Sequence, residues 1–309
     1  MTTSSLDSIR LRLAQLAAHL VVALVALVVI GGATRVMEAG LACPDWPLCY
    51  GTFLPGRQMN LQVFLEWFHR LDAFVVGMAL LVQLAAVWWY RRNLPAWLLP
   101  FSALLVLMVA LQGGLGALTV LQLLPSAVVT AHLALALTLV ISVSGLTQVL
   151  LSGSKASPAP RWWPWLGGLS VVAVSAQSLL GGRMATSWAA QRCLEAGQSC
   201  QWLHWHRSFA TPAALTVAVF VGVALLAGGW ARQQWPLLLT ALGLVAAQVA
   251  LGVSTLRMGL SQPALTVGHQ LVACLLVAVL AALSCRRPPS PPAPRSVVLD
   301  SPTLETCHG

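Results

Sequence analysis

Long apolar runs separated by short polar stretches dominate the chain. Eight segments consist mostly of apolar residues and reach about 20 residues, the length that a bilayer-spanning helix requires. They cover roughly residues 14–34, 65–89, 95–118, 127–150, 163–183, 205–229, 235–256 and 264–284. The runs are continuous rather than alternating, which argues against a β-barrel. The pattern predicts an all-α polytopic membrane protein with eight transmembrane helices.

Composition and charge support this class and indicate a topology. The chain is 58% hydrophobic and 8% charged, with a mean hydropathy of +0.81, whereas soluble domains carry roughly 25% charged residues. In a membrane protein the net charge of +9 reports orientation rather than a nucleic-acid partner. If the helices alternate in direction, one side receives Arg10, Arg12, Arg91, Arg92, Lys155, Arg161, Arg232, Arg286 and Arg287. Because basic loops stay inside, we expect both termini in the cytoplasm.

The N-terminal residues favour a bacterial plasma (inner) membrane. No small-residue cleavage site follows the first apolar run, which is therefore expected to be a retained helix and not a signal peptide. No long stretch rich in Arg and Ser precedes it, as an organelle transit peptide would require.

The eight segments form two similar halves. A Gly-Gly pair ends the first and the fifth segment (31–32 and 181–182), and Gln, Leu, Gly and Thr recur at matching positions of 111–119 and 247–255. We predict two tandem, pseudo-symmetric four-helix bundles, an architecture that hosts cofactors between facing helices. The expected units are a bundle at 1–151, a cytoplasmic linker at 152–162, a bundle at 163–285 and a disordered tail at 286–309. The glycines at 113, 114 and 116 are expected to let helices pack closely.

Four histidines repeat with one spacing across the halves. His69 and His132 lie 63 residues apart, as do His206 and His269. Each pair sits on two helices of the same direction, at roughly 6–8 Å below the outer surface for a rise of 1.5 Å per residue. Paired imidazoles are axial ligands of haem iron. Zinc or copper would need further ligands that the sequence does not place at this depth, so the pattern predicts two haem sites.

One acidic residue distinguishes the halves. Glu66 precedes His69 by three positions and shares its helix face, whereas the matching residue of the second half is Leu203. A carboxylate beside one site and a leucine beside the other predict sites with different tasks. We expect Glu66 to accept a proton near a reacting group. The alternative is a glutamate that the dipole favours at a helix N-terminus.

Arginines lie at helix ends at the depth of the histidines. They are Arg35, Arg70, Arg183, Arg207 and Arg257. Either their side chains snorkel to the interface, or they are counter-charges for anionic groups held at the outer face. We favour the counter-charges, because the arginines and the histidines share one depth.

Cysteines occur in pairs in two expected outer loops. Cys43 and Cys49 lie in the first loop, and Cys193 and Cys200 in a later one, which predicts two disulfides on the oxidising side. For Cys43–Cys49 a redox role and a structural role both stay open. For Cys193–Cys200 we favour a structural role.

Several of these motifs together resemble the haem A synthase family. In the first half they are Gly-Gly-Ala-Thr-Arg (31–35), Gly-Leu-Ala-Cys-Pro-Asp-Trp-Pro-Leu-Cys-Tyr-Gly (40–51), Glu-Trp-Phe-His-Arg (66–70), Gln-Gly-Gly-Leu-Gly (112–116) and His132. In the second half they are His206-Arg207, Gln248 and Gly268-His269. The similarity covers nearly all eight helices and leaves out the termini. Members of this family oxidise a methyl group of haem O to the formyl group of haem A, which goes to terminal oxidases.

The resemblance implies a role for each half. His69 and His132, with Arg35 and Arg70, would bind the substrate haem O, and Glu66 would be catalytic. His206 and His269 would be axial ligands of a haem b cofactor, with Arg183 and Arg207 beside it. Partners would be the haem O synthase (protohaem farnesyltransferase) that makes the substrate, and an electron acceptor. The acceptor, the source of the inserted oxygen, the delivery of haem O and the oligomeric state, a homo-oligomer included, do not follow from the sequence.

Two other functions use the same histidines. A di-haem b-type electron-transfer cytochrome would explain all four but not the absence of a second Glu66. A haem exporter or chaperone would return its haem unchanged. The products formed from haem O distinguish the three.

Overall fold

The computed structural model describes residues 3–153, 156–187 and 201–289, and these ranges contain helices and loops but no β-strand. The long helices are α1 (Thr3–Val36), α2 (Leu61–Trp89), α3 (Leu98–Leu121), α4 (Ser126–Ser152), α5 (Trp162–Thr186), α7 (Gln201–Ala227), α9 (Trp235–Arg257) and α10 (Pro263–Cys285). Two short helices, η1 (Gly56–Gln58) and α8 (Gly229–Gln233), lie between them. Within the described ranges, eight helices are long and apolar enough to cross a bilayer. The predicted class, an all-α polytopic membrane protein, is confirmed.

Several helix boundaries differ from those predicted, and two of the differences have a local cause. α2 begins at Leu61, because the side chain of Asn60 accepts a hydrogen bond of 3.0 Å from the backbone N–H of Val63 and caps the helix. α7 ends at Ala227, because Gly228 adopts φ of 72°, a left-handed conformation that glycine tolerates. His69 consequently lies eight residues after the first residue of α2, about 12 Å along the helix.

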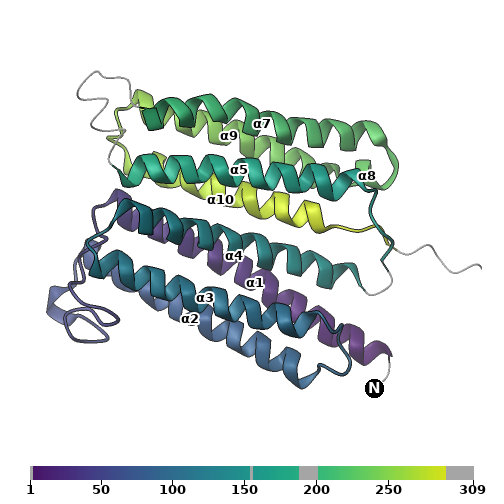
Figure 1. Cartoon of the computed structure of the whole chain (residues 1–309), viewed down its shortest axis with the longest axis horizontal. Helices are drawn as coiled ribbons and strands as arrows, with labels where there is room; N and C mark the ends of the chain where they lie inside the picture. The colour runs from purple at the N-terminus through teal and green to yellow at the C-terminus, as the bar shows by residue number, and fades with distance from the viewer. Residues whose placement is uncertain (1–2, 154–155, 188–200, 290–309) are drawn as a thin grey trace, which may run out of the picture.

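Each half of the chain closes into a ring of four helices (Figure 1). In the first half α1 contacts α2 and α4, and α3 contacts the same two helices. In the second half α5 contacts α7 and α10, and α9 contacts the same two. α2 therefore lies diagonally opposite α4, as α7 lies opposite α10. The order of contacts is the same in both halves. The predicted domain limits stay a prediction.

α10 and α4 join the two rings. α10 contacts α1 and α4, and α4 contacts α5. Across this seam the hydroxyl of Ser144 donates a hydrogen bond of 2.7 Å to the carbonyl oxygen of Ala278, which satisfies two polar groups in an apolar interior. Cys274 and Ala278 of α10 also belong to the apolar core of the first ring. The two rings therefore share part of one core.

The two ends of the bundle differ (Figure 1). The described chain begins and finishes at one end, and the loop at 37–60 lies at the other. α2, α4, α7 and α10 all begin at this loop end. All four histidines lie within the first three turns of these helices, so they gather toward the loop end.

Candidate functional site

Two histidines of the second half face each other across the interior of their ring. The ring centroids of His206 on α7 and His269 on α10 lie 6.4 Å apart, and the ring planes are inclined at 77°. A metal ion between two imidazoles needs about 2 Å for each metal–nitrogen bond and about 1 Å from each nitrogen to its ring centre, or about 6 Å in all. The pair is therefore spaced as two axial ligands of one iron would be.

His69 and His132 occupy the corresponding helices of the first ring. They lie close enough for their charges to interact. Within the described chain, the Nδ1 atoms of His69, His132 and His269 are buried and have no hydrogen-bond partner. Because buried polar atoms usually have one, these nitrogens are available to a ligand.

The donor set at each site is a pair of imidazoles. In the described ranges no three His, Cys, Asp or Glu side chains form a metal-binding group. A structural zinc site needs four such ligands, whereas haem supplies four nitrogens itself and requires only the axial pair. The unpartnered nitrogens and the 6.4 Å spacing of His206 and His269 fit a haem.

A glycine of a neighbouring helix lies against each histidine. A Cβ atom added at Gly31, Gly181 or Gly252 would lie 2.9 Å from the Cε1 atom of His69, His206 or His269, respectively. At Gly116 the corresponding distance to Cε1 of His132 would be 3.4 Å. A contact of 2.9 Å is shorter than ordinary van der Waals contact, so side chains at these positions would displace the imidazoles.

The expected packing role of the other glycines on α3 is wrong. A Cβ atom at Gly113 or Gly114 would meet no atom of the described chain within 4 Å. Gly116 makes room for a histidine ring rather than for a helix backbone. The Gly-Gly pairs and Gly252 were visible in the sequence as repeated glycines, but the sequence alone did not associate them with histidines.

The second glycine of each Gly-Gly pair connects the two halves. A Cβ atom at Gly32 would lie 1.7 Å from Oε1 of Gln270, the residue that follows His269. A Cβ atom at Gly182 would lie 2.6 Å from Cδ2 of Leu133, the residue that follows His132. In each Gly-Gly pair the first glycine therefore lies against the histidine of its own half. The second glycine lies against the residue that follows a histidine of the other half. The two sites are joined by direct packing.

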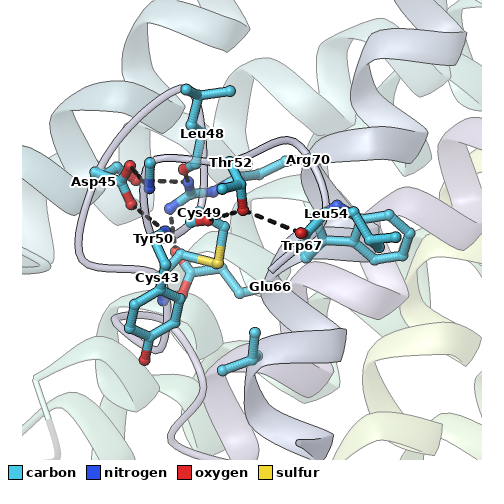
Figure 2. The surroundings of a disulfide bond; sticks show 12 residues. Cys43, Asp45, Leu48, Cys49, Tyr50, Thr52, Leu54, Glu66, Trp67 and Arg70 are labelled. Atoms are coloured by element: carbon cyan, nitrogen blue, oxygen red, sulfur yellow. Dashed lines mark hydrogen bonds and ion pairs between the residues drawn. A yellow bond between two sulfur atoms is a disulfide. The ribbon is translucent and has the colours of Figure 1, made fainter. Parts of the chain in front are cut away.

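Glu66 is buried and contacts the loop at 37–60 (Figure 2). The residue is 4% exposed. Its carboxylate accepts a hydrogen bond of 2.8 Å from the backbone N–H of Cys43 and one of 2.5 Å from the guanidinium of Arg70. These two donors orient the carboxylate toward the loop. The catalytic role of Glu66 stays a prediction, and its contact with the loop was not anticipated.

Arg70 connects α2 to the same loop. Its Nη1 donates to the carbonyl oxygens of Asp45 at 2.6 Å and Leu48 at 2.5 Å. The carboxylate of Asp45 in turn accepts from the backbone N–H groups of Tyr50 and Gly51. Arg70, expected beside a substrate haem, thus contacts the loop in this structure. The sequence did not indicate the backbone acceptors, which depend on how the loop folds.

One predicted disulfide is confirmed. Cys43 and Cys49 are bonded to each other, and both are buried with Val63 of α2. The second predicted pair, Cys193 and Cys200, lies outside the described residues. The free cysteines of the described chain are Cys274 and Cys285 on α10.

Two of the predicted haem arginines cross between the halves. Arg35 at the end of α1 donates a hydrogen bond of 2.7 Å to the carbonyl oxygen of Ala185, which belongs to the second half. Arg183 of α5 donates to the hydroxyl of Ser126 at the start of α4 and lies over the ring of Trp202. Arg207 is exposed beside His206. Neither cross-link could be derived from the sequence, because each depends on how the halves pack.

Comparisons with known proteins indicate the family of the chain. The model of the COX15-CtaA family, described as cytochrome oxidase assembly protein, matches residues 14–281. A haem A synthase of Rhodospirillum centenum is 28% identical over 86% of this chain and 86% of its own length. A haem A synthase of Sphingopyxis alaskensis is 28% identical over 84% of this chain and 88% of its own. With a haem A synthase of Shewanella oneidensis the identity is 29%, and the match spans about half of each chain, 54%.

The family match contains Glu66 and all four histidines. It extends over both rings of helices and stops short of the two termini, as the resemblance in the sequence did. The predicted resemblance is therefore confirmed, and the chain belongs to the COX15-CtaA family of cytochrome oxidase assembly proteins, together with the haem A synthases.

Proposed function

We propose that the chain is a haem A synthase, a haem-dependent membrane oxidoreductase that converts a methyl group of haem O to a formyl group. Haem A made in this way would supply terminal cytochrome oxidase. The observation that carries the proposal is the doubled site, in which two histidine pairs lie on corresponding diagonal helices and each ring rests against a glycine. Family membership supports the reaction.

The two halves take different roles in this proposal. His69 and His132 hold the substrate haem O, and His206 and His269 hold haem b. The support is the asymmetry at Glu66, which is buried in the first half, whereas Leu203 takes the matching position in the second. Haem b, when bound, would supply one-electron redox chemistry to the neighbouring site.

Glu66 accepts protons at the first site. With water as the oxygen source, each hydroxylation replaces a C–H bond of the methyl carbon with a C–O bond and releases two protons and two electrons. Glu66 takes up a proton, and the electrons pass to the electron acceptor. Two rounds give a geminal diol that loses water to the aldehyde. Glu66 lies one turn before His69 on α2, so its carboxylate and the imidazole share a helix face. Arg70 and the Cys43 N–H fix the orientation of that carboxylate. A held base needs little reorganisation when a proton is released.

We propose the loop end of the bundle as the outer side of a bacterial inner membrane, with both termini cytoplasmic. Basic residues concentrate at the opposite end, at Arg10, Arg12, Arg91, Arg92 and Arg161. The haem sites then lie near the outer face. A haem O synthase would deliver the substrate, and an electron acceptor would complete the reaction.

Product analysis tests the proposal. Cells that lack their own haem A synthase are given a haem O synthase with or without this chain, and extracted haems are separated by chromatography. We expect haem A only when the chain is present. Haem O that persists unchanged, with haem b bound to the purified protein, would refute the synthase and favour the electron-transfer cytochrome.

A further inference from the structure

The four histidine rings share one structural position. Each ring lies close to the backbone of the residue that is four positions before its glycine. These residues are Leu27, Gln112, Gln177 and Gln248, before Gly31, Gly116, Gly181 and Gly252. Three of the four positions are glutamines, and the exception is Leu27 beside His69.

Two of the glutamine side chains contact a histidine ring. The Nε2 atom of Gln177 lies 3.1 Å from Nδ1 of His206 and 2.6 Å from its carbonyl oxygen. The Nε2 atom of Gln248 lies 3.1 Å from Nε2 of His269. Both rings of the second half are therefore bonded by an amide side chain.

The first half lacks these contacts to its rings. The amide of Gln112 reaches only the carbonyl oxygen of His132, at 3.0 Å. Leu27 has no polar side chain, so it offers the ring of His69 no side-chain hydrogen bond. The two halves therefore differ in the hydrogen bonds that glutamine side chains make to their histidine rings.

An amide beside an axial histidine fixes the orientation of the ring. Because Gln177 bonds both the ring and the backbone of His206, it restricts rotation of the imidazole about its side-chain bonds. Its Oε1 atom is buried with no partner in the described chain, and half a turn of the amide would bring that oxygen to a ring N–H. Partners of this kind set the tautomer and basicity of a metal ligand, and their loss typically lowers metal affinity about 10- to 100-fold.

We propose that Gln177 and Gln248 are positioning residues that make the second half retain its haem, and that Leu27 leaves the first half free to exchange its haem. The proposal rests on the division of roles proposed above. A synthase must release one haem and keep the other, and the Gln-to-Leu difference gives these opposite properties to two otherwise similar sites.

Reciprocal substitutions test this inference in the full-length protein. Haem-loaded protein in nanodiscs is mixed with excess apomyoglobin, and haem transfer is followed by absorbance. For Gln177→Leu we expect loss of the second-half haem at least about 10-fold faster than in the parent protein, with a weakened low-spin spectrum. Gln112→Leu is the matched control and should leave that rate unchanged, because its amide does not touch a ring of the second half.

The converse variant excludes general misfolding as the cause. In a His206→Ala background, which leaves only the first site, the chain is loaded with haem O. We expect Leu27→Gln to slow release by about 10-fold, a gain that damage to the fold would not produce. Release rates within twofold of the parent for both Gln177→Leu and Leu27→Gln would overturn the inference.

The outcomes also separate this inference from the function on which it rests. If His206→Ala abolishes second-half haem but Gln177→Leu does not affect its release, the haem site stands and the role of the glutamine is refuted. If the parent chain binds no haem, or if its haem does not depend on His206, the proposed function and this inference both fail.

Discussion

A single added methyl group at Gly181 should remove the haem of the second half. The Cβ atom of Gly181→Ala would lie 2.9 Å from Cε1 and 3.3 Å from Nδ1 of His206. Ordinary contact begins near 3.4 Å, so the ring must retreat by about 0.5 Å. Metal–ligand distances tolerate about 0.2 Å. The displacement exceeds that tolerance, and we expect haem affinity to fall at least about 10-fold.

The assay is the haem content and low-spin absorption spectrum of purified Gly181→Ala protein. The matched control is Gly168→Ala on the same helix, where a Cβ atom would meet nothing within 4 Å in the described chain. The control should keep its haem, and it also tests whether replacing a glycine of α5 disturbs insertion. If both variants carry the parent amount of haem with the parent spectrum, His206 does not bind iron in the position described.

Three further substitutions probe the first half and its loop. Glu66→Gln should abolish conversion of haem O while the haem of the second half stays, which chromatography and spectra of the purified protein report; equal loss of both haems would contradict the division of roles. Gly31→Ala should weaken haem O binding far more than Gly116→Ala, because the added Cβ atoms lie 2.9 Å and 3.4 Å from their histidines, and equal titrations would refute the steric argument. Arg70→Met leaves the buried Glu66 without its cation, which costs about 3 kcal/mol of stability. We expect a water-soluble phosphine to reduce the Cys43–Cys49 disulfide at least tenfold faster than in the parent protein. An unchanged rate would mean that other contacts hold the loop.

The helices could be predicted from the sequence because lipid imposes a simple rule on apolar length. The errors were local. The start of α2 depends on the Asn60 cap, and the end of α7 depends on the backbone conformation of Gly228. Both features involve one or two residues, which a pattern averaged over some 20 residues does not detect.

The candidate site was predictable only in part. The spacing of the histidines indicated their pairing, because the repeat places equal residues at equal depth. The contacts of Glu66 with the Cys43 N–H and of Arg35 with Ala185 were not predictable, because each joins segments whose relation is set by tertiary packing. The Gln-x-x-x-Gly pattern was visible, but its meaning required the rings of His206 and His269 to be in place.

The number and kind of haems bound per chain distinguish the two halves. Protein is purified from cells with and without a haem O synthase, and its haems are extracted and quantified against polypeptide. We expect one haem b per chain without haem O, lost in His206→Ala and His269→Ala but kept in His69→Ala, and a second haem when haem O is made. A chain that binds haem b equally at both histidine pairs, or that keeps its haem b in His206→Ala, would contradict this division of roles.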